Sequence, residues 1–144
     1  MASRTATTLV HPPRDALSFT TVLAALSDPL RLGIVAKLGQ LGDGGELACV
    51  SFALPVSKST QSGHFRVLRE AGVVRQRDDG TRRLNKLRRD DLDARFPGLM
   101  DMAIRQGSAM VASVMASCPE KPTRERHSGG ALVALHTDAE DRSN

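Results

Sequence analysis

Apolar residues recur along the chain at the spacing of helix faces, with short polar breaks between them. The first stripe has members at i, i+3, i+4 and i+7, and this spacing predicts an amphipathic helix: Phe19, Val22, Leu23 and Leu26. A second helix is expected after "SDP", where Asp28 can cap the helix and Pro29 suits its first turn. The loop "GDGG" at 42–45 is expected to end it.

Two further helices joined by a tight turn are predicted next. "ELACVSFAL" at 46–54 is interpreted as a short helix closed by Pro55, because proline cannot continue a helix interior. The following helix is expected to start at Ser57, whose hydroxyl can cap it, and to be anchored by Phe65 and Leu68. Its first two turns, "SKSTQSGH", contain no large apolar side chain. The pair predicts a helix-turn-helix arrangement.

A β-hairpin and two helices complete the predicted order. The stretch 73–87 contains Asp79-Gly80, a strong signal for a hairpin turn. Neither face of this hairpin is cleanly apolar, so we expect it to bury little and to lie at the edge of the domain. "RDDLDARFPG" predicts a short helix, and an apolar stripe that starts at Leu99 predicts a long final one.

This order of elements predicts one domain of mainly α structure with a small β-hairpin, the winged helix-turn-helix fold. A flexible segment is expected at 1–15, the winged domain with its dimerisation helices at 16–116, and a disordered polar tail at 117–144. No apolar run is long enough for a membrane span, and the N-terminus lacks the apolar region of a secretory signal. With only two cysteines, a reducing cytoplasmic location is expected.

Basic residues are concentrated in one part of the chain. Residues 57–89 contain ten basic and three acidic residues, a formal charge of +7, whereas the whole chain carries +4 and the remainder therefore −3. A basic block in an otherwise slightly acidic protein indicates a polyanionic partner. A solvated basic surface is the alternative interpretation of the charge alone.

The polar helix start and the basic hairpin together suit double-stranded DNA. A helix fits the major groove, and its N-terminal turns, here with Gly63 allowing close approach, reach base edges through short polar side chains: Ser57, Lys58, Ser59, Thr60, Gln61, Ser62 and His64. For His64, a surface or capping role is the alternative. The hairpin offers basic side chains for the phosphate backbone: Arg75, Arg77, Arg82, Arg83 and Lys86.

Three stretches, "ALSDPLRLGIVAKL", "LPVSKSTQSGHFRVLREAGVV" and "DDGTRR", resemble the ArsR-type (ArsR/SmtB) family of bacterial transcription factors over residues 16–105. The resemblance implies a homodimeric winged helix that represses transcription from an inverted-repeat operator. It implies major-groove contacts from Lys58, Ser59, Gln61 and Ser62, and wing contacts from Arg77, Arg82 and Arg83. It also implies dimerisation through the first and last helices, for which the candidates are Phe19, Val22, Leu23, Leu99, Met102, Ala103, Met110 and Val114. A ligand pocket is the alternative for the methionines.

The sequence departs from this family where metal sensors bind their ions. The stretch before the turn has one cysteine, Cys49, instead of a Cys-x-Cys pair, and the last helix has Asp101 but no histidine. No metal or other cofactor is therefore predicted, and the effector is unknown. Leu84-Asn85 replaces the paired aromatic residues of the family's wing.

Other functions have weaker support. Cys49 is interpreted as a small buried apolar residue, with a thiol-redox or electrophile sensor as the alternative and Cys118 as a conceivable disulfide partner. An enzyme is not predicted, because the histidines are scattered and no nucleophile or phosphate-loop motif appears. The alternative class is a winged-helix module that docks a protein partner through its hairpin or its Met-rich helix.

Overall fold

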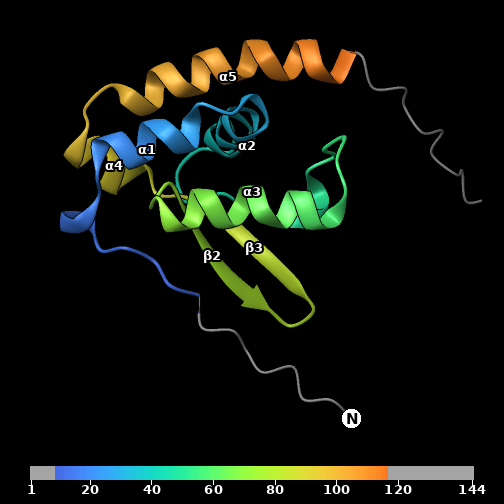
Figure 1. Ribbon diagram of the computed structural model, residues 1–144, viewed down its shortest axis with the longest axis horizontal. Helices are drawn as coiled ribbons and strands as arrows, with labels where there is room; N and C mark the ends of the chain where they lie inside the picture. The colour runs from blue at the N-terminus through green and yellow to red at the C-terminus, as the bar shows by residue number, and fades with distance from the viewer. Residues whose placement is uncertain (1–8, 117–144) are drawn as a thin grey trace, which may run out of the picture.

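A computed structural model describes residues 9–116 (Figure 1). The expectations for 117–144, including Cys118, lie outside the described residues. The chain is mainly helical with a small antiparallel sheet, and its elements are η1 (Arg14–Ala16), α1 (Phe19–Leu26), α2 (Pro29–Gly39), β1 (Glu46–Ala48), η2 (Cys49–Ser51), α3 (Lys58–Glu70), β2 (Val74–Asp79), β3 (Arg82–Leu87), α4 (Arg89–Arg95) and α5 (Leu99–Ala116).

The helix starts follow the capping residues that the sequence indicated. The Asp28 carboxylate accepts hydrogen bonds from the backbone N–H groups of Leu30, at 2.9 Å, and of Arg31, at 3.0 Å. Pro29 occupies the first position of α2, where its missing N–H costs nothing. Ser57 caps α3 by accepting from the Thr60 backbone N–H at 3.2 Å. These predicted boundaries are confirmed.

The predicted short helix at 46–54 is wrong. The segment forms the strand β1 and the single 3-10 turn η2, so the first half of the helix-turn-helix is not an α-helix. In β1, Leu47 is paired with Asn85 of β3, which gives a three-stranded sheet in the order β1-β3-β2. A short apolar run does not by itself distinguish helix from strand, and here the pairing with β3 decides.

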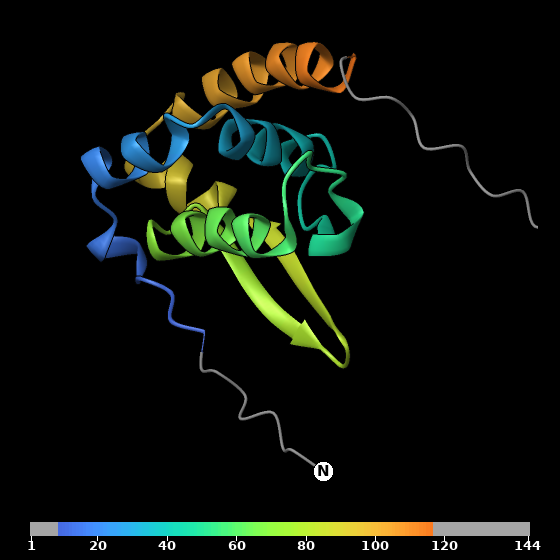
Figure 2. The ribbon, with the colours of Figure 1, turned by 45° about the vertical axis from the view of Figure 1, so that its right-hand side comes forward.

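The predicted hairpin is confirmed, but the expectation that it buries little is wrong at its base. Asp79 pairs with Arg82 across the turn, and Gly80 has a φ of +61°, which suits the first position of a two-residue turn. The inward face of β2 and β3 is buried even where it is polar: Val74, Gln76, Asn85 and Leu87. The tip extends away from the helices (Figure 2).

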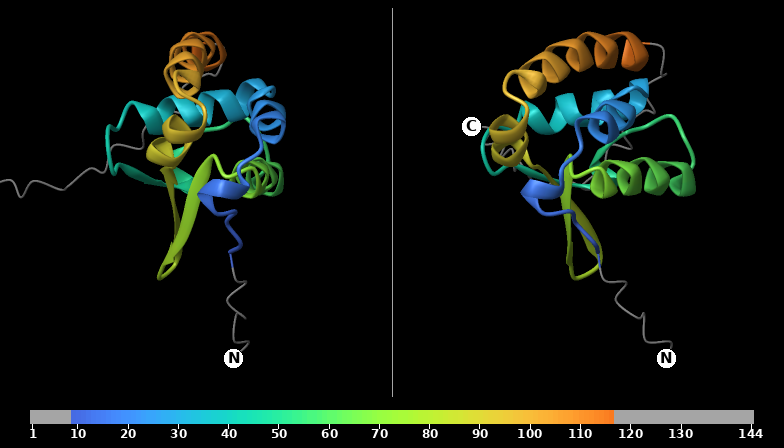
Figure 3. Two further views of the ribbon diagram at one scale, coloured as in Figure 1. Left: turned by 90° about the vertical axis from the view of Figure 1, so that its left-hand side faces the viewer. Right: turned by 60° about the vertical axis from the view of Figure 1, so that its left-hand side comes forward.

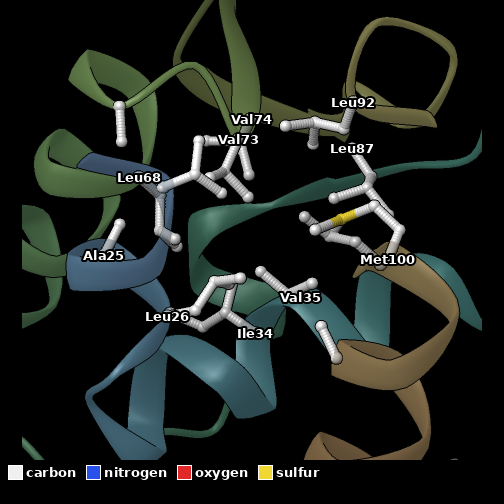
Figure 4. Close-up of a cluster of buried hydrophobic side chains, with 14 of the residues drawn as sticks. Ala25, Leu26, Ile34, Val35, Leu68, Val73, Val74, Leu87, Leu92 and Met100 are labelled. Carbon is white, nitrogen blue, oxygen red and sulfur yellow. The ribbon is translucent and has the colours of Figure 1, made fainter. Parts of the chain in front are cut away.

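The core is aliphatic apart from Phe52 and Phe65, whose rings meet edge to face at 5.2 Å between centroids. Helices α1 to α5 and the hairpin all contribute to this core. Figure 4 shows its labelled side chains packed together: Ala25, Leu26, Ile34, Val35, Leu68, Val73, Val74, Leu87, Leu92 and Met100. The hairpin base and α3 therefore share one core, so the two candidate DNA-binding elements are held together by apolar packing.

Helix α5 packs on α2 and lies on the side of the molecule opposite the hairpin tip (Figure 3). The approach is close at Gly107, where a Cβ atom would lie 2.5 Å from the Leu32 carbonyl oxygen. Across residues 9–116, no single helix is long and apolar enough to cross a membrane; α1 and α2 meet the length and composition criteria only as a pair bent by 101°.

Candidate nucleic-acid interface

The first turns of α3 present a polar surface to solvent. Lys58, Ser59, Thr60 and Ser62 are exposed, while Phe65 and Leu68 are buried and hold the helix on the core. The cap Ser57 also donates a hydrogen bond to the Thr60 hydroxyl at 2.9 Å, so part of the polar start is ordered by its own side chains. The first turns of α3, which were predicted to lack an apolar face, do not pack against the core.

Two of the predicted α3 side chains turn back onto the protein. The Gln61 amide donates to the Cys49 backbone carbonyl, and the Gln61 side chain is half-buried. His64 Nδ1 lies 4.0 Å from Asp28 Oδ1, and the His64 side chain is 13% exposed. Both residues therefore link α3 to neighbouring segments in this structure, and both would have to move to reach DNA.

Sequence reasoning missed one exposed cation on α3. Arg66 follows Ser62 by four residues, so both lie on one helix face, and Arg66 is exposed. Its position within the basic block and its i+4 spacing from Ser62 were the available signals. Gly63, between them, has no atom within 4 Å of the position a Cβ would take, so the backbone is open there.

The wing arginines are paired with carboxylates of the same sheet. Arg77 binds both oxygens of Glu46, at 2.6 and 3.0 Å, and Arg83 binds Asp78 at 2.9 Å. These hydrogen bonds hold the pKa values of the Glu46 and Asp78 carboxyls below their ordinary values. Arg82 pairs with Asp79 at 3.2 Å near the tip. Such exposed pairs are weak and screened by salt, so phosphates can compete for the guanidinium groups.

Three exposed cations of the basic block differ from these arginines. Within residues 9–116, Lys58, Arg66 and Lys86 have no carboxylate within 4.0 Å, whereas Arg75 approaches Asp91 at 3.9 Å. Lys58 and Arg66 lie on the exposed side of α3, and Lys86 is exposed on β3. These three side chains can meet a phosphate without first giving up an ion pair.

The segment before α1 contacts the base of the wing. His11 Nε2 accepts from the Gln76 backbone N–H at 2.9 Å, and Arg88 donates to the Pro12 carbonyl at 2.6 Å. Arg14 binds Asp91 at 2.7 Å and, with Arg88, lowers the pKa of that carboxyl. Burial, followed by the charges of nearby arginines, lowers the pKa of His11.

The candidate dimer residues fall into two groups. Val22 and Ala103 are buried in the core of the same chain, and Leu99 packs partly against it. The side chain of Val114 lies outside the described part. The other four are large and exposed by 42–57%: Phe19, Leu23, Met102 and Met110. Phe19 also contacts Phe96 of the α4–α5 connection, at 5.2 Å between ring centroids.

Cys49 lies at a junction between elements. Its sulfur accepts a hydrogen bond from the Asn85 amide at 3.2 Å, its carbonyl accepts from Gln61, and the residue is half-buried. Among residues 9–116, no three His, Cys, Asp or Glu side chains come together in a group that could hold a metal ion.

The structure combines a mainly helical fold, a small antiparallel sheet, an exposed polar helix start and a basic hairpin. This combination is consistent with a winged helix-turn-helix protein in which the turn η2 stands in place of the first helix of the pair. No protein-family model matches the chain. A protein of Bacillus subtilis (strain 168) described as the uncharacterized HTH-type transcriptional regulator YceK is 37% identical over 82 residues, which cover 56% of this chain and 80% of that protein. The chain therefore belongs to the HTH-type transcriptional regulators, which confirms the predicted class and its non-enzymatic character.

A solved structure also matches part of the chain. An ArsR-like transcriptional regulator from Rhodococcus sp. RHA1 matches with a TM-score of 0.46 and 22% identity, over 70% of this chain and 93% of that one.

Proposed function

We propose that this chain is an ArsR-type regulator that binds double-stranded DNA sequence-specifically. The supporting observation is the exposed, apolar-free start of α3 beside a basic hairpin that shares its core. In this proposal Lys58, Ser59, Thr60 and Ser62 contact base edges and Arg66 contacts a phosphate. The wing arginines, including Arg75, contact the backbone after exchanging their carboxylate partners for phosphates, and Lys86 contacts it directly.

We further propose a homodimer that represses transcription from an inverted-repeat operator. Large apolar side chains on α1 and α5 are exposed, and a second copy of the chain docked there would remove them from water. A two-fold dimer presents two α3 helices, and these match two symmetric half-sites. The α5 surface lies away from the hairpin tip, so dimerisation leaves the wing free (Figure 3). The proposal implies a cytoplasmic protein.

The test is selection of duplexes from a random pool, followed by gel shifts with the recovered sequence and a shuffled one. We expect an inverted repeat and preference for the selected duplex by roughly three or more orders of magnitude. Lys58→Ala should weaken that preference, whereas Thr20→Ala on the exposed side of α1 is the control. Equal affinity for both duplexes over a range of salt concentrations would refute sequence-specific binding. A sizing measurement tests the dimer.

Cys49 is a second candidate feature of the same function. We propose that a peroxide oxidises its thiolate to a sulfenic acid, with one peroxide oxygen transferred to sulfur and the other leaving as hydroxide. The hydrogen bonds from Asn85 and Gln61 connect this residue to the wing and to α3. If Cys49→Ser responds to hydrogen peroxide as the unmodified protein does, Cys49 is not the sensor.

The ion pairing of Arg77, Arg82 and Arg83 favours one alternative, a protein-docking winged helix, because it lowers the free positive charge of the wing. Such a protein would show no gel retardation by any duplex and would form a stable heteromeric complex.

A further inference from the structure

A chain of hydrogen bonds starts near the end of α3, contacts all three strands and returns near the start of α3. We propose that this network, made by Arg69, Gln76, Asn85, Cys49 and Gln61 and named here the wing-base network, positions the wing relative to α3 and so determines whether the wing reaches DNA. The inference rests on the proposed DNA-binding function. Its members are positioning residues and need not touch DNA themselves.

The network starts at the last turn of α3. Arg69 Nη1 donates to the Gln76 side-chain oxygen on β2 at 2.7 Å. The Gln76 amide nitrogen donates in turn to the Asn85 side-chain oxygen on β3 at 2.7 Å. Gln76 and Asn85 are cross-strand partners with exposures of 4% and 0%, so this link is sealed from water. The end of α3 is thereby tied to both wing strands.

The network then returns to the start of α3. The Asn85 amide nitrogen donates to the Leu47 carbonyl of β1 at 3.1 Å and to the Cys49 sulfur at 3.2 Å. The Cys49 carbonyl accepts from Gln61, one turn after the Ser57 cap. The N–H of Gln76 is also taken, by His11 at 2.9 Å. Asn85 therefore contacts every strand of the sheet through its side chain or its pairing.

These bonds restrict the direction of the wing in a way that apolar packing does not. Val74 and Leu87 already fill the hairpin base with aliphatic side chains, which tolerate small shifts. A buried amide, by contrast, loses its partner when a strand tilts, and an unpaired buried polar group is costly. A tilt of β2 or β3 against α3 would separate the partners bonded here, so in this proposal polar contacts set the angle between the recognition helix and the wing.

The positioning role predicts non-additive effects on DNA binding. In the unmodified protein, Arg82→Ala removes a cation near the wing tip, so the slope of log affinity against log salt should fall by about 0.9 for each phosphate that is no longer neutralised. Asn85→Leu breaks the network and should produce the same fall by itself. In the Asn85→Leu background, Arg82→Ala should then change neither the affinity nor the slope, while the preference for the selected over the shuffled duplex persists.

Destabilisation alone is controlled by Leu87→Ala, which removes apolar packing from the same strand but leaves the network intact. In that background Arg82→Ala should keep its full effect. Arg69→Met opens the network at its half-buried end and is the second variant if Asn85→Leu does not fold.

A full Arg82→Ala effect in the Asn85→Leu and Arg69→Met backgrounds would overturn the inference. So would an Arg82→Ala change without effect in the unmodified protein. Failure of the unmodified protein to prefer any duplex would instead refute the proposed function.

Discussion

Gly63→Ala separates the stability of α3 from its approach to DNA. Gly63 lies in the middle of α3, and no atom lies within 4 Å of the position that a Cβ would occupy. The methyl group is therefore accommodated in the free protein. Since glycine inside a helix costs roughly 0.5–1 kcal/mol relative to alanine, the variant should be more stable by about that amount. For a domain of this size, the midpoint of thermal unfolding should rise by roughly 2–6 °C.

The same methyl group should weaken DNA binding. If the backbone at Gly63 approaches the groove walls closely, an added carbon overlaps DNA atoms, and overpacking of this kind costs about 1–3 kcal/mol. That corresponds to a loss of affinity of roughly five- to 150-fold for each copy that binds DNA. The measurement is a titration of the selected duplex by fluorescence anisotropy, alongside thermal unfolding of the same preparation.

The midpoint of thermal unfolding should rise while the affinity for DNA falls, so a loss of folded protein cannot explain the weaker binding. Ala94→Gly, on an exposed position of α4, is the converse control: it should lower the unfolding midpoint and leave DNA affinity unchanged. A Gly63→Ala protein that is more stable and binds DNA as tightly as before would refute the close approach of α3 at this position.

Three further outcomes follow from the geometry described above. Gly107→Ala should lower the free energy of unfolding by about 1–3 kcal/mol, because its Cβ would lie 2.5 Å from the Leu32 carbonyl oxygen. If urea denaturation gives the same free energy of unfolding for this variant and the unmodified protein, the close α2–α5 packing is contradicted. Ser59→Ala should cost about 1–3 kcal/mol for the selected duplex and little for the shuffled one, and competition gel shifts separate these. The pKa of His11 is lowered from 6.5, so the folded state favours the neutral ring and its stabilising contribution is present above 6.5 and lost as pH falls through the folded pKa. Urea unfolding between about pH 7.5 and 5 should show this decline, and His11→Asn should lack that component; identical slopes would exclude His11.

The sequence predicted the fold well where local chemistry decides it. The Asp28 and Ser57 caps and the Asp79-Gly80 turn each act over a few residues, and the boundaries they indicated are those of α2, α3 and the hairpin. The exposed start of α3 could also be predicted, because helix turns that do not pack against the core lack large apolar residues and the sequence shows this directly.

Long-range contacts explain what was missed. The strand β1 depends on pairing with residues 84–86, almost forty positions away, so the local pattern at 46–54 suggested a helix instead. The hydrogen bond from the Gln61 side chain to the Cys49 carbonyl also depends on this segment forming β1 and η2 instead of a helix. Buried Gln76 and Asn85 made the hairpin look uniformly polar, since their mutual hydrogen bond cannot be inferred from either residue alone.

The hydrogen bond between His11 and Gln76 also bears on how copies of this chain avoid aggregating. β2 is an edge strand of the sheet, and an unpaired edge N–H is a template for a strand of another molecule. The imidazole takes up the Gln76 N–H, and Arg75, Arg77 and Asp79 place charges along the rest of that edge. The hairpin can therefore extend into solvent as a bare ribbon without recruiting a second sheet.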